Sequence, residues 1–270
     1  MTVVTISRGS GSMGKAVAEK AAARLGYACL SRDVLLEASE LYNQPEVQLQ
    51  SAIADAPSFL DRFTHGKQKY IAFIQSALTR HVIQDKIIYH GLAGHLLLKN
   101  VSHVLKVRIQ ADHDSRVELV MKRDRVGQAE AARMIATLDG QRQRWTRSLY
   151  DADPGDSSLY DLQISLPRYS IDAAADLICR SVEFEPFKTT PESQRQMEDL
   201  ALACRIKAAL VEDHPSISVV SRYGNVVVYG ASGDRQAHKL KAGIDELGSD
   251  IEGMNNIEVH ADVEPPDTAV

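Results

Sequence analysis

Short β-branched runs alternate with longer amphipathic stretches through the first two thirds of the chain. Apolar runs bounded by glycine or polar residues predict buried strands over 3–6, 86–89, 104–109 and 162–165. Apolar positions spaced by three or four residues predict helices over 15–25, 32–42, 68–84, 115–124, 130–150 and 170–182. We expect Gly26 to end the first helix and Ser170 to cap the last one. Strands that alternate with helices predict a parallel sheet with helices on both faces.

The last third of the chain follows a different order of elements. Its pattern predicts helices and strands in the order α-β-β-α-β, over 200–211, 217–221, 225–229, 236–247 and 257–263. Arg222-Tyr223-Gly224 separates the first two of these strands, which predicts an antiparallel hairpin, and Gly230 should end the second strand. The sequence therefore predicts a small α+β domain after the α/β domain.

A change in composition marks the expected boundary between the two domains. Two prolines and two threonines within 185–192 are typical of a linker. From residue 199 onward the chain carries twelve acidic and six basic residues, so the net charge of −5 arises in this segment. We expect an α/β domain over 1–184, a linker over 185–198, an α+β domain over 199–263 and a frayed tail over 264–270.

Composition and charge exclude several classes of protein. A hydrophobic content of 44% with 25% charged residues is ordinary for a globular chain and excludes disorder over most of it. No apolar run reaches the roughly 18 residues of a membrane span, and residues 1–15 lack the pattern of a secretory leader, so we expect a cytoplasmic location. The net negative charge disfavours nonspecific binding of nucleic acid. Three widely spaced cysteines favour neither a disulfide framework nor a zinc site.

A glycine-rich loop follows the first predicted strand. Gly9-Ser10-Gly11-Ser12-Met13-Gly14-Lys15 fits the pattern of Gly, four residues and Gly-Lys, and it stands between a strand and a helix N-terminus. Glycines let backbone N–H groups point inward around phosphates, and the helix N-terminus adds unpaired donors. Lys15 would bridge the outer phosphates of a nucleotide. The alternative is a glycine-rich turn that binds no ligand, and Ala16 stands where a metal-binding Ser or Thr usually follows the lysine.

The chain resembles the cytidylate-kinase-like proteins, which are P-loop kinases related to bacterial cytidylate kinase. At its opening the resemblance rests on Val4-Thr5-Ile6-Ser7-Arg8, on Gly11-Ser12 with Gly14, and on Ala18-Glu19-Lys20. Further segments match in order along 1–183: Leu30-Ser31-Arg32-Asp33, 104–109 with Arg116, Asp139 with Arg142, Tyr160-Asp161-Leu162 and 172–178. The resemblance implies a P-loop kinase-like α/β fold.

The resemblance also implies an activity and a set of site residues. The activity is that of a nucleoside monophosphate kinase, which transfers the γ-phosphoryl group of ATP to a pyrimidine nucleotide such as CMP, with Mg²⁺. Lys15 and Arg142 would be catalytic. The cofactor would lie against Arg8, Gly9, Gly11, Ser12, Gly14, Lys15 and Arg144, and the acceptor against Arg32, His90 and Gly91. Seven basic and three acidic residues within 122–147 suit two polyanionic substrates, although a solvated charged helix would have the same composition.

Departures from the family pattern leave a second function open. Met13 replaces a small residue in the loop, and Ala16 offers no hydroxyl. Cytidylate kinases end their second strand in Gly-Arg, whereas Leu92 follows Gly91 here. His90 and His95 would either supply part of the missing charge or be structural. The alternative function is a degenerate, non-catalytic nucleotide-binding regulator whose second domain binds a partner or small ligand.

Residues 199–263 resemble a BON domain. The resemblance rests on 203–210, 224–230, 236–247 and 253–259, which match the family's order of helix, hairpin, helix and final strand. It implies binding of phospholipid or another ligand, but the negative charge of the segment disfavours anionic lipid surfaces. A protein partner, a small ligand, and a dimerising or stabilising role in a homo-oligomer stay open.

Two weaker features complete the candidate chemistry. Asp151, Asp153 and Asp156 loosely fit a calcium loop but lack the terminal glutamate, so we expect no metal site there. Trp145 would either stack on a base or pack in the core, and packing is the favoured interpretation.

Overall fold

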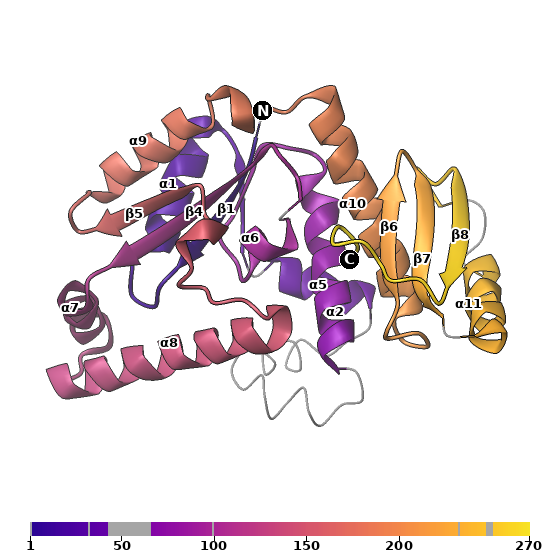
Figure 1. Ribbon diagram of the computed structural model, residues 1–270. Helices are drawn as coiled ribbons and strands as arrows, with labels where there is room; N and C mark the ends of the chain where they lie inside the picture. The colour runs from indigo at the N-terminus through magenta and orange to yellow at the C-terminus, as the bar shows by residue number, and fades with distance from the viewer. Residues whose placement is uncertain (1, 32, 43–65, 99, 232, 247–250) are drawn as a thin grey trace.

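The larger of two sheets has five parallel strands. The computed structural model describes residues 2–31, 33–42, 66–98, 100–231, 233–246 and 251–270. Within them the strand order is β2-β3-β1-β4-β5, and Figure 1 shows the neighbouring strands β1, β4 and β5 of this sheet. The strands are β1 (Val3–Arg8), β2 (Ala28–Leu30), β3 (Ile87–Tyr89), β4 (Val104–Ala111) and β5 (Leu162–Leu166). The predicted parallel sheet is therefore confirmed, and β2 is a strand that the sequence pattern missed.

Both faces of this sheet are buried, which explains the β-branched character of its central strands. On β1, Val3 and Val4 point to opposite faces and belong to different apolar clusters. Helices α1 (Gly14–Leu25) and α9 (Ile171–Ser181) pack on one face. The other face is covered by α2 (Asp33–Leu41), α5 (Gly66–Val82), α6 (Gly94–Leu97) and part of α10 (Pro191–Leu210).

The predicted helix ends are confirmed at both positions that the sequence singled out. Gly26 caps α1 in the left-handed conformation, with φ of 66°, and its N–H donates to the Ala22 carbonyl. The Ser170 side chain accepts a hydrogen bond from the Ala173 N–H at the start of α9. These caps fix where the first and last helices of the α/β domain meet the sheet.

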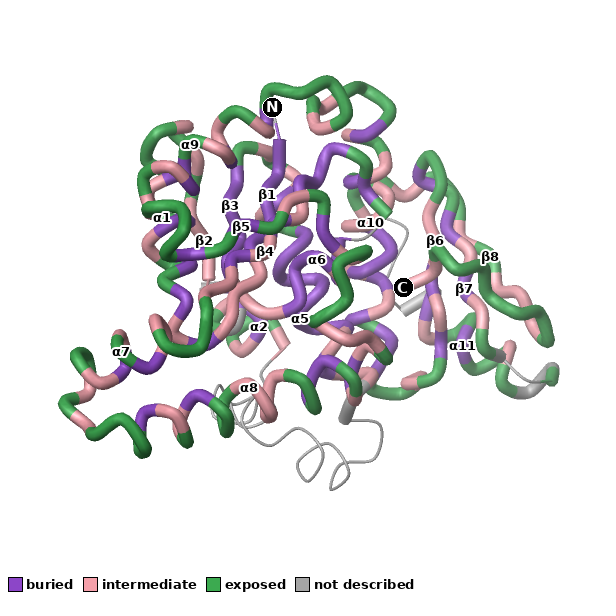
Figure 2. The backbone as a smooth tube through the Cα atoms, turned by 60° about the vertical axis from the view of Figure 1, so that its left-hand side comes forward, coloured by how far each residue is buried: buried purple, intermediate pink, exposed green. Residues whose placement is uncertain are grey.

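Two charged helices form an arm that projects from the sheet. They are α7 (His113–Asp124) and α8 (Gln128–Tyr150), which pack on each other through Val117, Val120, Ala131 and Ile135. Figure 2 shows that most of the arm's outer surface is exposed. The far end of α8 returns to the sheet, where Trp145 and Leu149 join the core beneath α5. One helix thus connects the arm with the core.

The C-terminal part of the chain builds a second, smaller sheet. Its strands β6 (Ser218–Arg222), β7 (Asn225–Ala231) and β8 (Asn256–Ala261) lie in that order, and α11 (Asp234–Glu246) packs on them. The first pair is antiparallel, as predicted, and the second pair is parallel. The expectation that Gly230 ends the second strand is wrong. Gly230 has φ of 104° and sits at a shift of register between Tyr229 and Ala231, so it kinks β7 without ending it.

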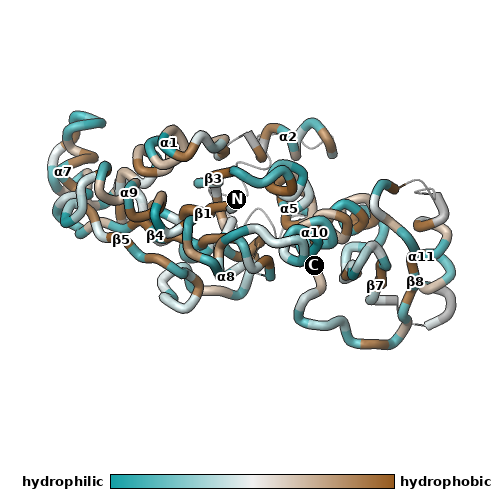
Figure 3. The backbone as a smooth tube through the Cα atoms, turned by 90° about the horizontal axis from the view of Figure 1, so that it is seen from above, coloured by the Kyte–Doolittle hydropathy of each residue, from teal (hydrophilic) through white to brown (hydrophobic). Residues whose placement is uncertain are grey.

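Helix α10 belongs to both cores. It begins at Pro191, within the segment expected as a linker, because Thr190 and Ser193 form a reciprocal cap at its start. A short 3₁₀ turn over Glu185–Phe187 precedes it. Met197 packs in the core of the large sheet, whereas Ile206 packs in the core of the small one. Seen from above in Figure 3, α10 lies between the two sheets.

The last residues of the chain do not fray as expected. The Val270 N–H donates to the Val219 carbonyl at 2.9 Å, and the Val219 N–H donates to the Val270 carbonyl at 3.1 Å. These reciprocal bonds cover part of the open edge of β6, which stabilises the C-terminus. The pattern of residues along the sequence could not predict this pairing. Among the described residues, no helix has an apolar stretch long enough to cross a membrane.

The shared helix predicts that the two sheets unfold together. Met197→Ala leaves a cavity at a fully buried position, and we expect the free energy of unfolding to fall by about 2–4 kcal/mol. Calorimetry should show one transition, shifted to lower temperature as a whole. Two resolved transitions, of which only one moves, would contradict the shared role of α10.

Candidate functional site

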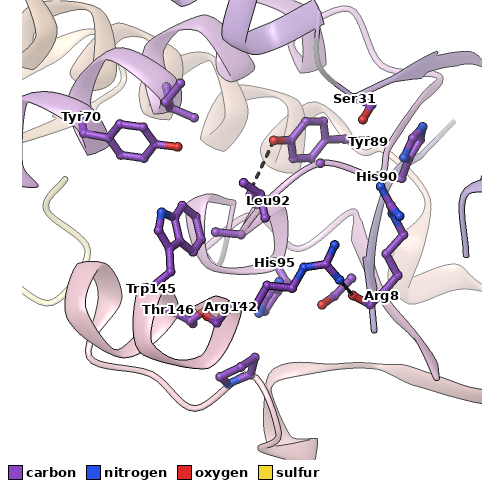
Figure 4. A pocket seen from close by; sticks show the side chains of 15 residues that line it. Arg8, Ser31, Tyr70, Tyr89, His90, Leu92, His95, Arg142, Trp145 and Thr146 are labelled. Carbon is purple, nitrogen blue, oxygen red and sulfur yellow. Dashed lines mark hydrogen bonds between the residues drawn. The ribbon is translucent and has the colours of Figure 1, made fainter. Parts of the chain in front are cut away.

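A cavity of about 310 Å³ opens where β1 and β3 end. In parallel α/β sheets, ligands bind outside the carboxyl ends of the strands. Figure 4 shows the side chains that converge on it. The ends of β1, β2 and β3 and the turn after β3 contribute Ser7, Arg8, Ser31, Tyr89, His90, Gly91, Leu92, Ala93 and His95. Helices α5 and α8, with the loop after α8, contribute Tyr70, Ile74, Arg142, Trp145, Thr146 and Pro154.

The glycine-rich loop turns directly from β1 into α1 beside this cavity. Gly11 has φ of 71°, and Met13, where the family pattern has a small residue, holds the left-handed conformation at φ of 55°. A Cβ on Gly14 would lie 2.7 Å from the Arg8 Cβ, so α1 starts against the end of β1 only because this position is glycine.

The loop has the features of a phosphate site. The Ser10 and Ser12 hydroxyls are buried, and neither has a hydrogen-bond partner among the described residues. Such groups are costly unless a ligand or water satisfies them. Together with the start of α1 at Gly14, they offer donors to the oxygens of a phosphate group. Gly9 anchors the loop, since its N–H donates to the Ile109 carbonyl at 3.3 Å.

Both helices of the arm are tied to this loop. Arg116 of α7 donates to the Ser10 carbonyl at 2.6 Å and pairs with Asp139 of α8 at 2.5 Å. The Ser10 N–H in turn points at the Asp139 carboxylate, at 3.4 Å. The sequence matched Arg116 and Asp139 to the family without assigning them a role. In the structure they set the position of α8 over the site.

Two arginines face each other in the cavity. A guanidinium nitrogen of Arg142 donates to the backbone carbonyl of Arg8 at 3.0 Å, and Figure 4 shows Arg142 reaching from α8 toward Arg8. Burial lowers the pKa of both guanidinium groups, and the charge of Arg8 lowers the pKa of Arg142 further. No aspartate or glutamate is among the described residues that line the cavity. The lining therefore carries positive charge only, and the carboxylate that acts on Arg142, that of Asp139, lies outside the lining and raises the pKa of Arg142.

The structure brings together only part of the site that the sequence predicts. Arg8, His90, Gly91 and Arg142 line the cavity. Lys15 does not line it, because its side chain is 64% exposed and pairs with Glu19 at 3.6 Å. Arg144 is exposed on α8 and does not line the cavity either. Arg32 lies outside the described residues.

A buried polar cluster lies beneath the cavity. The Tyr160 hydroxyl lies 3.3 Å from both Ser7 Oγ and His95 Nε2, and it donates to the Pro154 carbonyl at 3.0 Å. Arg108 lies over the Tyr160 ring, with its guanidinium carbon 5.3 Å from the ring centre. Burial, followed by the charges of Arg108 and Lys106, lowers the pKa of His95 to about 4.

The two histidines therefore do not replace a missing charge at neutral pH. His95 is neutral there, and burial followed by the charge of Arg8 also lowers the pKa of His90. Of the two interpretations that the sequence left open for His90 and His95, the structural one is thus favoured. Arg8 and Arg142 supply the positive charge of the cavity.

Aromatic rings form one wall of the cavity, which the sequence did not identify as a group. Tyr70 and Trp145 meet edge to face with ring centres 6.1 Å apart. The Tyr89 hydroxyl donates to the Leu92 carbonyl at 3.1 Å. Trp145 both packs in the core and faces the cavity, so the two interpretations of this residue are compatible. Tyr70 and Tyr89 lie at core positions of α5 and β3, so apolar periodicity alone could not mark them as site residues.

The acidic side chains of the loop after α8 make structural hydrogen bonds. Asp153 accepts from Arg147 at 2.7 Å and from the Gly155 N–H at 2.8 Å, and Asp156 caps the 3₁₀ turn over Ser157–Leu159. In the described part of the chain no three acidic, histidine or cysteine side chains gather as metal ligands. The Ala16 side chain has no oxygen to offer to Mg²⁺.

The fold and the loop are those of the P-loop kinase class, and similarity to known proteins narrows the class to a family. Residues 3–167 match the cytidylate kinase-like family, and the chain belongs to it. A cytidylate kinase from Methanopyrus kandleri is 28% identical over 106 residues, which are 37% of this chain and 55% of that protein. The chain thus spans about half the length of this curated relative.

One solved structure agrees with the fold. An uncharacterized protein from Eubacterium ventriosum superimposes with a TM-score of 0.51 and 20% identity, over 68% of this chain and 99% of that one, and at this identity the likeness concerns the fold alone. A shikimate kinase from Bacteroides thetaiotaomicron covers the same share of each chain, with a TM-score of only 0.42 and 9% identity.

The neutral state of His95 predicts loss of stability in acid. Its pKa of about 4 in the folded protein lies below the ordinary 6.5, so between these values the unfolded chain binds a proton that the folded one does not. His95 should therefore cost about 2 kcal/mol of stability between pH 7 and pH 5. Urea unfolding of the His95→Gln variant should show a smaller loss on acidification than the parent chain. An equal loss in both would contradict the buried neutral histidine.

Proposed function

We propose that this protein is a nucleoside monophosphate kinase, which transfers the γ-phosphoryl group of ATP to a pyrimidine nucleotide of the CMP type. One observation carries the proposal: an aromatic-walled cavity that is lined by two arginines and by no described acidic residue opens beside the glycine-rich loop. The loop suits the phosphates of ATP, and the cavity suits a second ligand that has a ring and an anionic group. Membership of the cytidylate kinase-like family supports the same activity.

The chemistry of the cavity favours a phosphate acceptor over a hydroxyl acceptor. A hydroxyl must lose its proton on attack, usually to a carboxylate, and no described residue of that type lines the cavity. A phosphate monoester is already an anion near neutral pH, so its oxygen attacks the γ-phosphorus without a base. The bond from the γ-phosphorus to the β-bridging oxygen then breaks, and ADP leaves with the electron pair.

Helix α8 would control access to the reacting groups. It carries Arg142 into the cavity and is held over the loop by Asp139 and Arg116. Guanidinium groups stabilise the charge that spreads over the transferring phosphoryl oxygens, and a closed arm excludes water. Mg²⁺ would enter bound to ATP, since Ala16 has no side-chain oxygen and no described carboxylate lines the cavity.

A non-catalytic nucleotide-binding regulator is the second candidate function. Ala16 and the outward direction of Lys15 favour it, because both remove groups that promote transfer in P-loop enzymes. In this case the domain over residues 199–263, which resembles a BON domain, would transmit the nucleotide-bound state by binding a partner or a small ligand. The α10 helix, which packs against both sheets, would connect the two parts.

An ADP-release assay with ATP, Mg²⁺ and a panel of nucleoside monophosphates separates the two functions. We expect ADP to form with CMP or a related pyrimidine nucleotide. Arg142→Ala should lower kcat/KM at least a hundredfold, whereas Arg133→Ala, an exposed arginine of the same helix, should change it less than threefold. No ADP with any acceptor, while ATP still raises the unfolding temperature, would instead favour the regulator.

A further inference from the structure

Arg8 is a cation placed at the centre of the site with no acidic partner. It is the last residue of β1, and its partly buried side chain lines the cavity between His90 and Arg142. Its side chain passes close to Gly14, where a Cβ would lie 2.7 Å from the Arg8 Cβ and 3.1 Å from its Cδ. No described aspartate or glutamate forms an ion pair with it. A cation taken out of water without a counter-ion is costly, so this position suits an anionic ligand.

Arg142, the second cation of the cavity, is held in place by the backbone carbonyl of Arg8. Arg142 donates one hydrogen bond to the Arg8 carbonyl, which leaves the rest of its planar fork free to meet a ligand. Burial is the main cause of the lowered pKa of Arg142, and the charge of Arg8 lowers it further, so the two guanidinium groups repel each other. A doubly charged tetrahedral anion between them would remove that repulsion and accept hydrogen bonds from both forks.

Lys15 occupies a different place. Its exposed side chain extends to Glu19 and does not line the cavity, although the charges of both residues act on the pKa of His90. A lysine that bridges phosphates must point over the loop into the site. In this protein the cationic side chain that points into the cavity beside the loop is that of Arg8, the last residue of β1.

We propose that Arg8 and Arg142, and not Lys15, form the phosphate-binding pair of this site, and that the pair holds the phosphate of the acceptor. The naming of the acceptor rests on the proposed kinase function, whereas the anion site itself does not. The acceptor side is assigned because the pair shares its cavity with His90, Gly91 and Ser31 from the strands beyond β1. The loop hydroxyls of Ser10 and Ser12 do not line that cavity, which leaves them to the phosphates of ATP.

The chain offers a direct probe of this cavity. Trp145 is its only tryptophan and lines the cavity wall, so a change in tryptophan emission reports ligand binding there. Inorganic phosphate is titrated into the full chain at constant ionic strength, and CMP and cytidine are titrated in parallel. The parent chain should give a saturable response to phosphate and should bind CMP at least tenfold more tightly than cytidine.

Three variants locate the phosphate contact. Arg8→Ala and Arg142→Ala should each weaken phosphate at least tenfold and bring the affinity of CMP close to that of cytidine. Lys15→Ala should keep both affinities within twofold of the parent chain. Arg142 lies on the surface of α8, outside the sheet, so its replacement disturbs folding less. The Arg142→Ala variant therefore still tests the proposal if Arg8→Ala does not fold.

The outcomes separate this inference from the kinase proposal. Phosphate affinity that survives both arginine variants, that is lost in Lys15→Ala, or that is absent from the parent chain would overturn the inference. The titration contains no ATP, so a chain that binds phosphate through Arg8 but releases no ADP would contradict only the kinase. Conversely, ADP release that Arg8→Ala leaves intact would contradict only the arginine pair.

Discussion

The close approach of Gly14 to Arg8 is the constraint on which the site depends. Because the glycine has no Cβ, α1 starts directly against the end of β1, and a side chain there would lie 2.7 Å from the Arg8 Cβ. The Arg8 side chain passes close to the start of α1, since its Cδ would lie 3.1 Å from a Cβ on Gly14, and it lines the cavity. The loop and the cavity thus meet at one tight turn, and under the proposed function they would divide the space at the sheet edge between two anionic ligands.

Helices from distant parts of the chain complete this edge. Arg116 and Asp139 hold α8 over the loop, and Trp145 anchors the same helix in the core beneath α5. Helix α5 carries Tyr70 into the cavity wall, while its Phe73 packs against Ala208 of α10. The small sheet therefore adjoins an element of the site, although the two cores are separate.

The sequence predicted the α/β fold because the strands are buried on both faces and their β-branched runs are hard to mistake. It also located the glycine-rich loop, and it named Arg8 and Arg142. It could not show that Lys15 turns outward, since a pattern fixes the position of a residue and not the direction of its side chain. The aromatic wall was missed for a related reason: Tyr89 and Trp145 serve the core and the cavity together. Proline and threonine before α10 were interpreted as a linker, but the same residues cap a helix.

A crystal structure of the chain with ADP and CMP tests the central claim most directly. The account predicts the ADP phosphates on the N–H groups between Gly11 and Gly14, and the CMP phosphate within hydrogen-bond distance of Arg8 and Arg142. The cytosine ring should lie against the wall formed by Tyr70 and Trp145. CMP bound outside this cavity, or an acceptor phosphate held by Lys15 with Arg8 unengaged, would contradict the account.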